Sequence, residues 1–489
     1  MCGAVLSKEG QRVCILEKNE QIGGNLQTFK RDGKTFDTGV HYVGGLDKGQ
    51  NLYKYFNYLG IVDRLHMERL DENGFDIVAF KDSERTYKLG MGYDRFKEIL
   101  LSDFPFEEAA INKYCADMQK LSKSYPMYYV SAAEQYDSNE LMSMGAEEYL
   151  TALTDNKKLR TVLAGNMFVY AGVAGKTPLY VHALIEDSYI ESAYRFIDGG
   201  DQIAQQLSRV IKNNGGDILR KHEVATLVEE GGKIVYAEDA EGNRFSADNF
   251  ISNIHPAQTM KLTDSKLIRG AYRSRLNGLE NSVSVFAIYI SLKEHSLLYD
   301  KCNFNYFAEP DAWVGGNYTE DTWPYMYAMY PAAMQADSKY ADTISIMCFM
   351  RYDEVKTWAD THNTTLKKNE RGETYTQFKK RKAEKLLDVV EEKFPNFRRH
   401  IESYYTATPL TFRDYIGSDD GTLYGIVKDH KDMARTYISP RTKIANLYLT
   451  GQNINIHGVL GVTVSAFLTC SMMIDKKTLI DKVNDANKN

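Results

Sequence analysis

The chain has 489 residues, and its 60 Lys and Arg against 66 Asp and Glu give a formal net charge of −6. This length predicts two or three folding units, at about 150 residues per unit. A mildly acidic chain lacks the basic surface that binds phosphate backbones, so no nucleic acid is expected as a partner. Hydrophobic residues at 43% and charged residues at 26% are ordinary globular values and exclude a wholly disordered chain.

Cysteine positions and the N-terminal residues bear on redox state and location. Six cysteines stand at positions 2, 14, 115, 302, 348 and 470, none in a Cys-x-x-Cys pair and none at ligand spacing from a histidine. We therefore expect reduced cysteines and no metal site. No signal-peptide pattern opens the chain, and no apolar run is long enough to span a bilayer. These features predict a cytoplasmic protein.

The N-terminal segment predicts a helix, a glycine turn and a buried strand. Residues 2–10 are typical of the second half of a helix closed by Gly10, and the apolar run 12–16 ends at Glu17 as a buried parallel strand would. This is a strand–helix–strand unit without its first strand. An acid at the end of the second strand of such a unit can accept hydrogen bonds from both hydroxyls of an adenosine ribose. A solvated loop glutamate is the alternative reading of Glu17.

The rest of the chain alternates between helical and strand patterns. Apolar residues at helical spacing predict a mostly helical insert over 92–160, and a second strand–helix–strand pattern begins at 196–200 with its helix at 202–213. Further strands are predicted at 233–238, 244–248, 249–253, 283–292, 344–351 and 447–449, and further helices at 366–394 and 462–474.

Glycine-rich turns stand near both ends of the chain. Gly23 and Gly24 come six and seven residues after Glu17, where glycine lets the backbone approach a flat or phosphorylated ligand closely. The run 36–42, Phe-Asp-Thr-Gly-Val-His-Tyr, gives a second tight turn with polar groups. The strand at 447–449 leads into Thr-Gly-Gln at 450–452 and His-Gly at 457–458.

Two other motifs are incomplete. Residues 174–177, Ala-Gly-Lys-Thr, resemble the end of a phosphate-binding loop, but the earlier glycine that this loop requires is replaced by Tyr170. His222-Glu223 begins like a zinc-protease motif, but the position of the second histidine holds Thr226. We expect neither nucleoside triphosphate nor metal at these segments.

Taken together, the motifs resemble flavoproteins of the glutathione-reductase-like class, and more narrowly the phytoene desaturase and amine oxidase branch. The resemblance rests on 3–6, 13–17, 23–24 and 36–39 near the N-terminus, on Gly199-Gly200, and on 447–452 and 457–462 near the C-terminus. It therefore spans most of the chain. The runs 38–44 and 408–415, with Gln452-Asn453, fit the retinol saturase subgroup.

This resemblance implies an α/β fold, in which a glutathione-reductase-like FAD-binding Rossmann domain carries an inserted α+β substrate domain. The implied FAD-binding domain comprises residues 1–85, 190–262 and 430–489, and the substrate-binding domain, with its helical insert, comprises 86–189 and 263–429. The family opens with a strand and a Gly-x-Gly-x-x-Gly turn that cradles the cofactor pyrophosphate, but the sequence holds no such motif. We expect a start assigned too late or a trimmed chain; the alternative is a true short form that binds flavin weakly or not at all.

The resemblance also implies a set of FAD-binding residues. Glu17 would bind the ribose, Val224 would contact adenine through its backbone, and the helix that follows His457-Gly458 would point its positive end at the flavin ring. The full set is Glu17, Lys18, Gly23, Gly24, Asn25, Thr28, Gly39, Val40, His41, Val224, Asn253, Gly451, Gln452, Gly458, Val459 and Gly461.

The implied chemistry is hydride transfer through the flavin to or from a C=C or C–C bond of a hydrophobic, retinol- or carotenoid-like polyene. Saturation of a double bond also needs a proton, and His41, Tyr42 and His457 are the candidate catalytic donors. Backbone hydrogen bonding is the alternative role for a histidine in a glycine-rich turn. Five aromatic residues could wall a tunnel for the substrate, although core packing or a protein interface explains them equally well: Tyr318, Trp323, Tyr325, Tyr327 and Tyr330.

Two other functions remain open from the sequence: a flavin amine oxidase of the same fold, and a non-catalytic form that no longer holds FAD. NAD(P)H is open as the electron donor, although only one dinucleotide-type unit is visible. A lipophilic substrate suggests a peripheral membrane contact, which no basic amphipathic helix supports. The oligomeric state is unknown.

Overall fold

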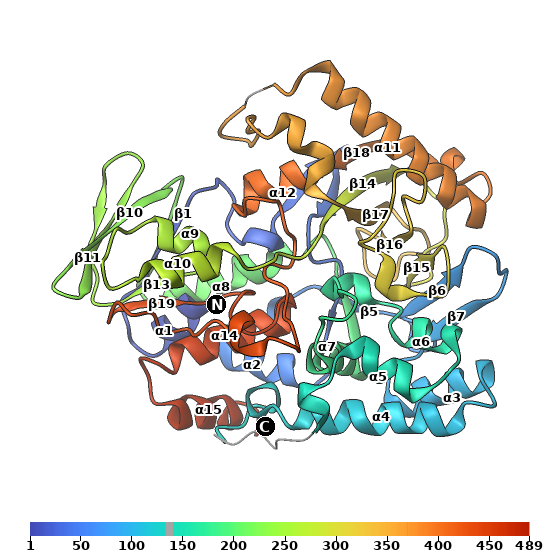
Figure 1. Cartoon of the computed structure of the whole chain (residues 1–489), viewed down its shortest axis with the longest axis horizontal. Helices are drawn as coiled ribbons and strands as arrows, with labels where there is room; N and C mark the ends of the chain where they lie inside the picture. The colour runs from blue at the N-terminus through green and yellow to red at the C-terminus, as the bar shows by residue number, and fades with distance from the viewer. Residues whose placement is uncertain (134–139, 369, 489) are drawn as a thin grey trace.

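The computed structural model describes residues 1–133, 140–368 and 370–488. Short parallel strands occupy one side of the molecule, on the left in Figure 1. Strand β1 (Cys14–Glu17) pairs in parallel with β9 (Asp217–Arg220), and β13 (Phe250–Ser252) pairs in parallel with β19 (Leu447–Leu449). An antiparallel sheet of β10 (Val224–Glu230), β11 (Lys233–Asp239) and β12 (Arg244–Phe245) lies at their outer side (Figure 1). These pairings bring residues from both ends of the sequence into one region.

Three helices pack together beside the parallel strands. Helix α1 (Cys2–Lys8) contacts both α8 (Asp201–Asn213) and α14 (Gly458–Cys470). It lies close over β1, because a Cβ at Gly3 would come within 2.9 Å of the Ile15 side chain. Helix α8 buries Ile203, Leu207 and Ile211, which recur on one face at helical spacing. The N-terminal and C-terminal helices are thus held against the same strands.

A seven-stranded mixed sheet fills the upper right of Figure 1, in the order β18-β14-β17-β16-β15-β6-β7. All nine residues of β14 are buried, as expected for a strand covered on both faces. Helix α11 (Gly372–Lys393) lies along this sheet and buries Phe378, Leu386 and Val390. The strand bounds are β6 (Asp76–Phe80), β7 (Thr86–Leu89), β14 (Ser284–Leu292), β15 (Asn303–Phe307), β16 (Met326–Ala332), β17 (Thr343–Met350) and β18 (Ile401–Ala407).

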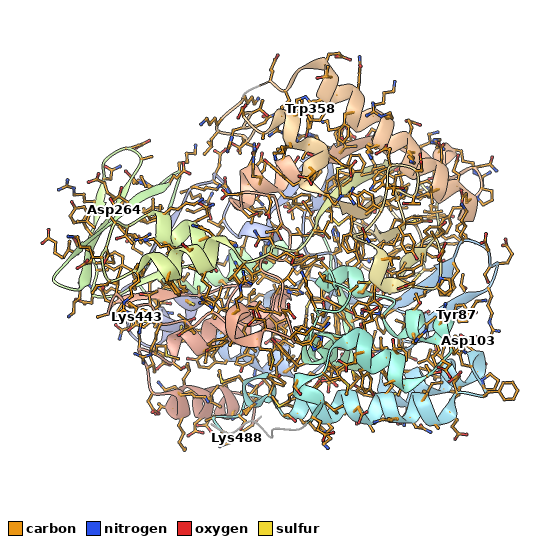
Figure 2. The ribbon with its side chains drawn as sticks, in the orientation of Figure 1. Tyr87, Asp103, Asp264, Trp358, Lys443 and Lys488 are labelled. Carbon is orange, nitrogen blue, oxygen red and sulfur yellow. The ribbon has the colours of Figure 1, made fainter. Side chains whose placement is uncertain are left out.

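A helical layer occupies the lower right of Figure 1 and confirms the insert predicted over 92–160, of which residues 134–139 lie outside the described part. Its helices are α3 (Tyr93–Asp103), α4 (Glu108–Lys123), α5 (Ala146–Leu153), α6 (Lys157–Leu163) and α7 (Leu179–Glu191). Helix α4 packs on α7, whose first ten residues are nearly all buried. The end of α3 lies beside β7, where Asp103 pairs with Arg85 at 2.7 Å and the ring of Tyr87 stacks on Phe104 (Figure 2).

A small antiparallel sheet corrects one sequence prediction. Strand β8 (Ala193–Phe196) pairs antiparallel with β4 (Val43–Gly44) and β5 (Met67–Arg69), whereas β9 pairs with β1. The two strands that flank α8, β8 and β9, therefore belong to different sheets. The segment that begins at 196 does not form a second parallel strand–helix–strand unit. Local pattern cannot distinguish the two cases, because only tertiary pairing decides which sheet a strand joins.

The remaining elements connect these layers. Strands β2 (Thr28–Arg31) and β3 (Lys34–Asp37) form a hairpin, and η1 (Gly24–Leu26) precedes it. The other helices are α2 (Asn51–Leu59), α9 (Pro256–Lys261), α10 (Gly270–Asn277), α12 (Pro409–Ile416), α13 (Met433–Thr436) and α15 (Lys476–Asp485). None of the described helices is both long and apolar enough to cross a membrane.

Element positions agree with most of the sequence predictions. The α/β class is confirmed, and the strands predicted at 12–17, 233–238, 249–253, 283–292, 344–351 and 447–449 are present within one or two residues. Helix α11 begins at Gly372 and not at 366, and α14 begins at Gly458 and not at 462. The proposed domain division stays a prediction; strand β6, from the segment 1–85, pairs with β15 from the segment 263–429.

The seven-stranded sheet supplies the first testable prediction. Ile288 in the middle of β14 is fully buried, so Ile288→Ala should lower the free energy of unfolding by about 2–5 kcal/mol through lost burial and an internal cavity. Ile254→Ala is the matched control, because the Ile254 side chain is 43% exposed. Urea unfolding of both variants measures the difference, and equal losses would show that β14 is not in the core.

Candidate functional site

The two ends of the chain meet at the glycine turns that the sequence singled out. The Asn25 side-chain amide lies 3.4 Å from the Gln452 side-chain oxygen. Gly39 lies against the same residue, because a Cβ there would stand 2.9 Å from the Asn25 carbonyl oxygen. Gly451, with φ +94°, is packed against the Asn253 side chain. The middle of the predicted site is therefore assembled from three segments of the sequence.

The acidic end of the site begins where β1 ends. The Glu17 carboxylate accepts a hydrogen bond from the Asn19 amide at 2.8 Å, and burial raises the Glu17 pKa. The Glu17 carbonyl accepts from the His222 amide at 2.9 Å, which places Val224, at the start of β10, close to this end. Lys18 turns away and donates to the Asp414 carbonyl at the end of α12. Glu17 and Val224 are brought near each other, whereas Lys18 contacts another element.

The glycine turn after Glu17 lies close over α8 and the hairpin. Gly23 has φ +111°, and a Cβ there would come within 3.0 Å of Ala204 on α8. Gly24 has φ +56° and open space where a Cβ would stand. Thr28 lies against Gly199, and Val40 lies near Gly200. A Cβ at Gly24 would therefore meet no neighbour, whereas one at Gly23 would press on α8.

The N-terminus of α14 borders a cavity. Gly458, the first residue of α14, has φ +76°, and no atom lies within 4 Å of the point where a Cβ would stand. The cavity has a volume of about 40 Å³, and its wall combines the backbone of the helix terminus with apolar side chains. Its lining includes Val43, Gly44, Leu184, Ile185, Tyr189, Val459 and Gly461. The predicted residues Gly458, Val459 and Gly461 therefore share one space with the segment that follows Tyr42.

Two buried histidine nitrogens lack partners in this region. The Nε2 atoms of His41 and His457 are shielded from solvent and have no hydrogen-bond partner among the described residues. Burial, with the charge of Arg195, lowers the His41 pKa to about 3, and burial, with the charge of Lys428, lowers the His457 pKa to about 3. Both rings are neutral imidazoles at neutral pH, so neither carries a proton as imidazolium.

Tyr42, the third candidate donor, belongs to a buried polar network. Its hydroxyl donates to the Asp76 carboxylate at 2.9 Å, and the Asn303 side chain donates to the same carboxylate at 2.8 Å. Arg195 donates to the Asn303 side-chain oxygen, to the Pro331 carbonyl and to the Tyr299 hydroxyl. Burial raises the Asp76 pKa to about 6, against the opposing effect of these hydrogen bonds.

The predicted aromatic tunnel is divided by the sheet. Tyr330 stacks on His41 with ring centroids 4.4 Å apart and lies 5.9 Å from Tyr42. Tyr327, three residues earlier on β16, stacks instead on Tyr306, because side chains at odd spacing on a strand point to opposite faces. Trp323 packs on Phe286, Tyr318 contacts Arg351, and Tyr325 is half-buried just before β16. Among the described residues, Tyr330 is thus the member of the predicted tunnel whose ring contacts the candidate proton donors His41 and Tyr42. Trp323, Tyr318 and Tyr327 contact residues outside this group of donors.

Residues of the two incomplete motifs, at 174–177 and 222–223, form hydrogen bonds and ion pairs with neighbouring side chains. The Gly175 amide donates to Glu147 and Lys176 pairs with Glu280, as in an ordinary turn. His222 lies 2.6 Å from Asp239 in an ion-pair geometry. Within the described residues no three His, Cys, Asp or Glu side chains gather as metal ligands.

Several residues at this site were not predicted from the sequence. Asp76, Arg195 and Asn303 form the network behind Tyr42, and Tyr189 and Tyr424 place their rings 4.5 Å from Tyr42 and 5.0 Å from His457. Asp76 had a visible signal, since it is a charged residue at the start of the apolar run 76–80. The others had none, because a single Tyr, Asn or Arg next to a strand is common on any surface.

Comparison with known proteins gives concordant results. The model of the family described as "Flavin containing amine oxidoreductase" matches residues 1–471. An all-trans-retinol 13,14-reductase from Danio rerio is 27% identical over 97% of this chain and 84% of its own length. A chloroplastic prolycopene isomerase from Daucus carota is 23% identical over 86% of this chain and 69% of its own length. The crystal structure of an oxidoreductase from Methanosarcina mazei superposes with a TM-score of 0.64 at 15% identity, over 96% of both chains.

Gly458 provides a prediction for flavin retention. Gly458→Val puts a branched side chain into the free space at the start of α14 and into a left-handed backbone, so bound flavin per protein should fall about tenfold or more. Gly242→Val is the matched control, because Gly242 has φ +87° and equally open surroundings but lies in the turn before β12. Both variants should lose similar stability, about 1–2 kcal/mol, and only the first should lose flavin. Equal flavin absorbance in the two would contradict the placement.

Glu17 provides a second prediction, for the strength of flavin binding. Removal of a charged hydrogen-bond acceptor in Glu17→Ala should weaken flavin binding by about 1.5–3 kcal/mol, measured by fluorescence titration of the deflavinated protein with FAD. Glu20→Ala is the control, since Glu20 lies in an exposed ion pair with Lys221. If Glu17→Ala binds as tightly as Glu20→Ala, Glu17 does not contact the cofactor.

Proposed function

Because the chain belongs to the flavin containing amine oxidoreductase family, whose model matches residues 1–471, we propose that it is an FAD-dependent oxidoreductase that acts on a C=C or C–C bond of a hydrophobic polyene. Family membership confirms the predicted superfamily and makes the protein a flavin enzyme. The polyene is the proposed part. It is supported by relatives whose names specify a retinol reductase and a prolycopene isomerase.

The residues present fit a flavin. Gly458 places backbone at the wall of the cavity, and a Cβ at Gly24 or Gly458 would meet no neighbour, so a flat ligand can approach the backbone closely at both turns. The orphaned Nε2 atoms of His41 and His457 are buried polar groups that a bound ligand can satisfy. We propose that Glu17 and Val224 hold the adenosine end, that the turns at Gly23, Asn25 and Gly39 hold the middle, and that Gln452 and the start of α14 hold the ring.

When bound, the flavin supplies hydride-transfer chemistry, and the protein supplies position, charge and exclusion of water. The first N–H groups of α14 receive no hydrogen bond from the side chain of its N-cap, His457, and with the positive end of the helix dipole they would stabilise negative charge on a bound ring. Burial lowers the Lys428 pKa to about 8, and Lys428 donates to the Asn453 carbonyl at 2.8 Å between β19 and α14. Both features favour a negatively charged group at this end of the site.

The single observation that carries the polyene proposal is the group of apolar side chains in the wall of the cavity at α14, a wall that also includes Ser188 and His457. Leu184, Ile185, Val43 and Val459 line it, and they come from α7, β4 and α14. A conjugated hydrocarbon gains affinity from apolar and aromatic surfaces of this kind. Since such substrates reside in lipid, a peripheral membrane contact is part of the proposal, and NAD(P)H is proposed as the electron donor.

The proposal is tested with the purified chain in detergent. Protein with flavin bands, reduced under nitrogen and mixed with all-trans-retinol or a carotenoid, should be reoxidised and yield a product heavier by two hydrogens. A saturated product only in the presence of NADPH or NADH would identify the donor, and a reaction of oxidised protein with a more saturated polyene would identify desaturation as the direction.

Two results would replace this proposal with its alternatives. Oxidised protein that turns over primary amines with release of hydrogen peroxide, and leaves polyenes unchanged, would make it a flavin amine oxidase. A colourless protein that does not take up added FAD would make it a non-catalytic form. Protein with Gly458→Val provides the background rate for each assay.

A further inference from the structure

Two cysteines from opposite ends of the sequence lie together where α1 packs on α14. Cys2 is the first residue of α1, and Cys470 is the last residue of α14. The Cys2 Sγ atom lies 3.7 Å from the Ala466 carbonyl oxygen, and the Cys470 Sγ atom lies 3.8 Å from the Cys2 carbonyl oxygen. Ala466 stands one helical turn before Cys470 on the same face of α14. Both sulfur atoms therefore occupy one contact between the two helices.

The two thiols interact with each other as well as with the backbone. The hydrogen bond between them lowers the pKa of the Cys2 thiol and raises the pKa of the Cys470 thiol. The Thr450 hydroxyl, whose oxygen lies 3.4 Å from the Cys2 Sγ atom, also lowers the Cys2 pKa. Because the thiolate and not the thiol is the nucleophile, Cys2 is the more reactive sulfur of the pair.

The remaining cysteines have the character of ordinary core or surface thiols. Burial raises the pKa of each of them: Cys14, Cys115, Cys302 and Cys348. Cys348, for example, is buried in β17 with its Sγ atom 3.8 Å from the Phe286 carbonyl oxygen. A thiol with a raised pKa is a weak nucleophile at neutral pH. Cys2 is thus the cysteine of this chain that combines a lowered pKa with a neighbouring thiol.

We propose that Cys2 and Cys470 form a dithiol that hydrogen peroxide oxidises reversibly to a disulfide between α1 and α14. The inference is independent of the proposed function, because it concerns the contact between two helices and not the ligand. The two residues are 468 positions apart, so the disulfide makes the association of the two ends of the chain covalent. The same ends carry the turns of the candidate site.

The exposure of the two side chains sets the order of the reaction. Cys2 is half-buried, whereas Cys470 is fully shielded from solvent. A small oxidant therefore meets Cys2 first, and Cys470 reacts afterwards from within the protein. An accessible thiol of low pKa next to a second, resolving thiol is the usual arrangement of a redox-responsive cysteine pair.

The oxidation balances with hydrogen peroxide as the oxidant. The Cys2 thiolate attacks one peroxide oxygen, the O–O bond breaks, and the leaving hydroxide takes up the proton from the Cys2 thiol to form water. Cys2 is then a sulfenic acid. The Cys470 sulfur attacks the Cys2 sulfur, the S–O bond breaks, and the hydroxyl group leaves with the Cys470 proton as a second water. The two thiols lose two electrons and two protons, and a dithiol reductant restores them by thiol–disulfide exchange.

The chemical test treats the purified chain with hydrogen peroxide, blocks the remaining thiols with N-ethylmaleimide and digests the protein without reductant. Mass spectrometry should find the Cys2 and Cys470 peptides joined and two hydrogens lighter than their sum, and dithiothreitol should separate them. In Cys470→Ser the joined peptide should be absent, and dimedone should trap Cys2 as a sulfenic acid. Cys14→Ser is the matched control, because Cys14 is an exposed cysteine on β1, and it should form the link as the wild type does. Wild-type protein whose Cys2 and Cys470 stay unlinked, or whose Cys2 joins Cys14, would overturn the proposal.

Urea unfolding tests the consequence for the fold. A covalent link between residues so far apart restricts the unfolded chain, so the oxidised wild type should unfold at a higher urea concentration than the reduced protein. Dithiothreitol should abolish this difference. Each variant is compared with itself before and after peroxide, and neither Cys2→Ser nor Cys470→Ser should show a rise. An equal rise in these variants, or no rise in linked wild-type protein, would refute a disulfide that holds the two helices together.

Discussion

Contact between the two ends of the chain is the constraint on which the site depends. Asn25 reaches Gln452 across 427 positions, and Cys2 reaches Thr450 across 448. Closing a loop of this length costs conformational entropy, although the cost grows only slowly with length. It is offset by the packing of α1 on α14 and by the burial of the apolar residues between them. A ligand that bridges the turn at Gly24 and the start of α14 would be held by both ends, so its binding and their association are linked.

The buried network around Arg195 joins this region to the large sheet. Arg195 on β8 donates to the Pro331 carbonyl on β16, to the Asn303 side chain on β15, and through Nε to the His41 carbonyl at 3.3 Å. A guanidinium with its donors directed at neutral acceptors fixes geometry with several hydrogen bonds and leaves the nearby carboxyls without a direct ion pair. The same contacts that position the His41–Tyr42 segment therefore leave Asp76 without a direct ion pair, and burial raises the Asp76 pKa to about 6.

Local features of the fold were predictable, and the features that assemble the site were not. The acid at the end of β1, the turn at Gly23-Gly24 and the strand before Gly451 follow from apolar runs and glycine spacing, which depend on nearby residues alone. The antiparallel pairing of β8 depends on β4 and β5, which are distant in sequence. The tyrosines of β16 were grouped by sequence, but strand alternation sends Tyr327 and Tyr330 to opposite faces. Asp76 is marked in the sequence as a charged residue at the start of an apolar run, but its burial and its partners depend on tertiary contacts that the sequence does not show.

The distribution of protons distinguishes histidine from carboxylate in this site. Imidazole is the usual physiological acid, yet burial lowers the pKa of His41 and His457 to about 3, because the positively charged ring is the form that loses hydration. Burial has the opposite effect on a carboxyl, whose charged form is the deprotonated one, and it raises the Asp76 pKa to about 6. Burial therefore favours the neutral form of each group, which is the deprotonated form of imidazole and the protonated form of a carboxyl. The two histidines therefore enter the site as neutral hydrogen-bonding groups, whereas Asp76, which holds Tyr42 and Asn303, changes its charge near pH 6.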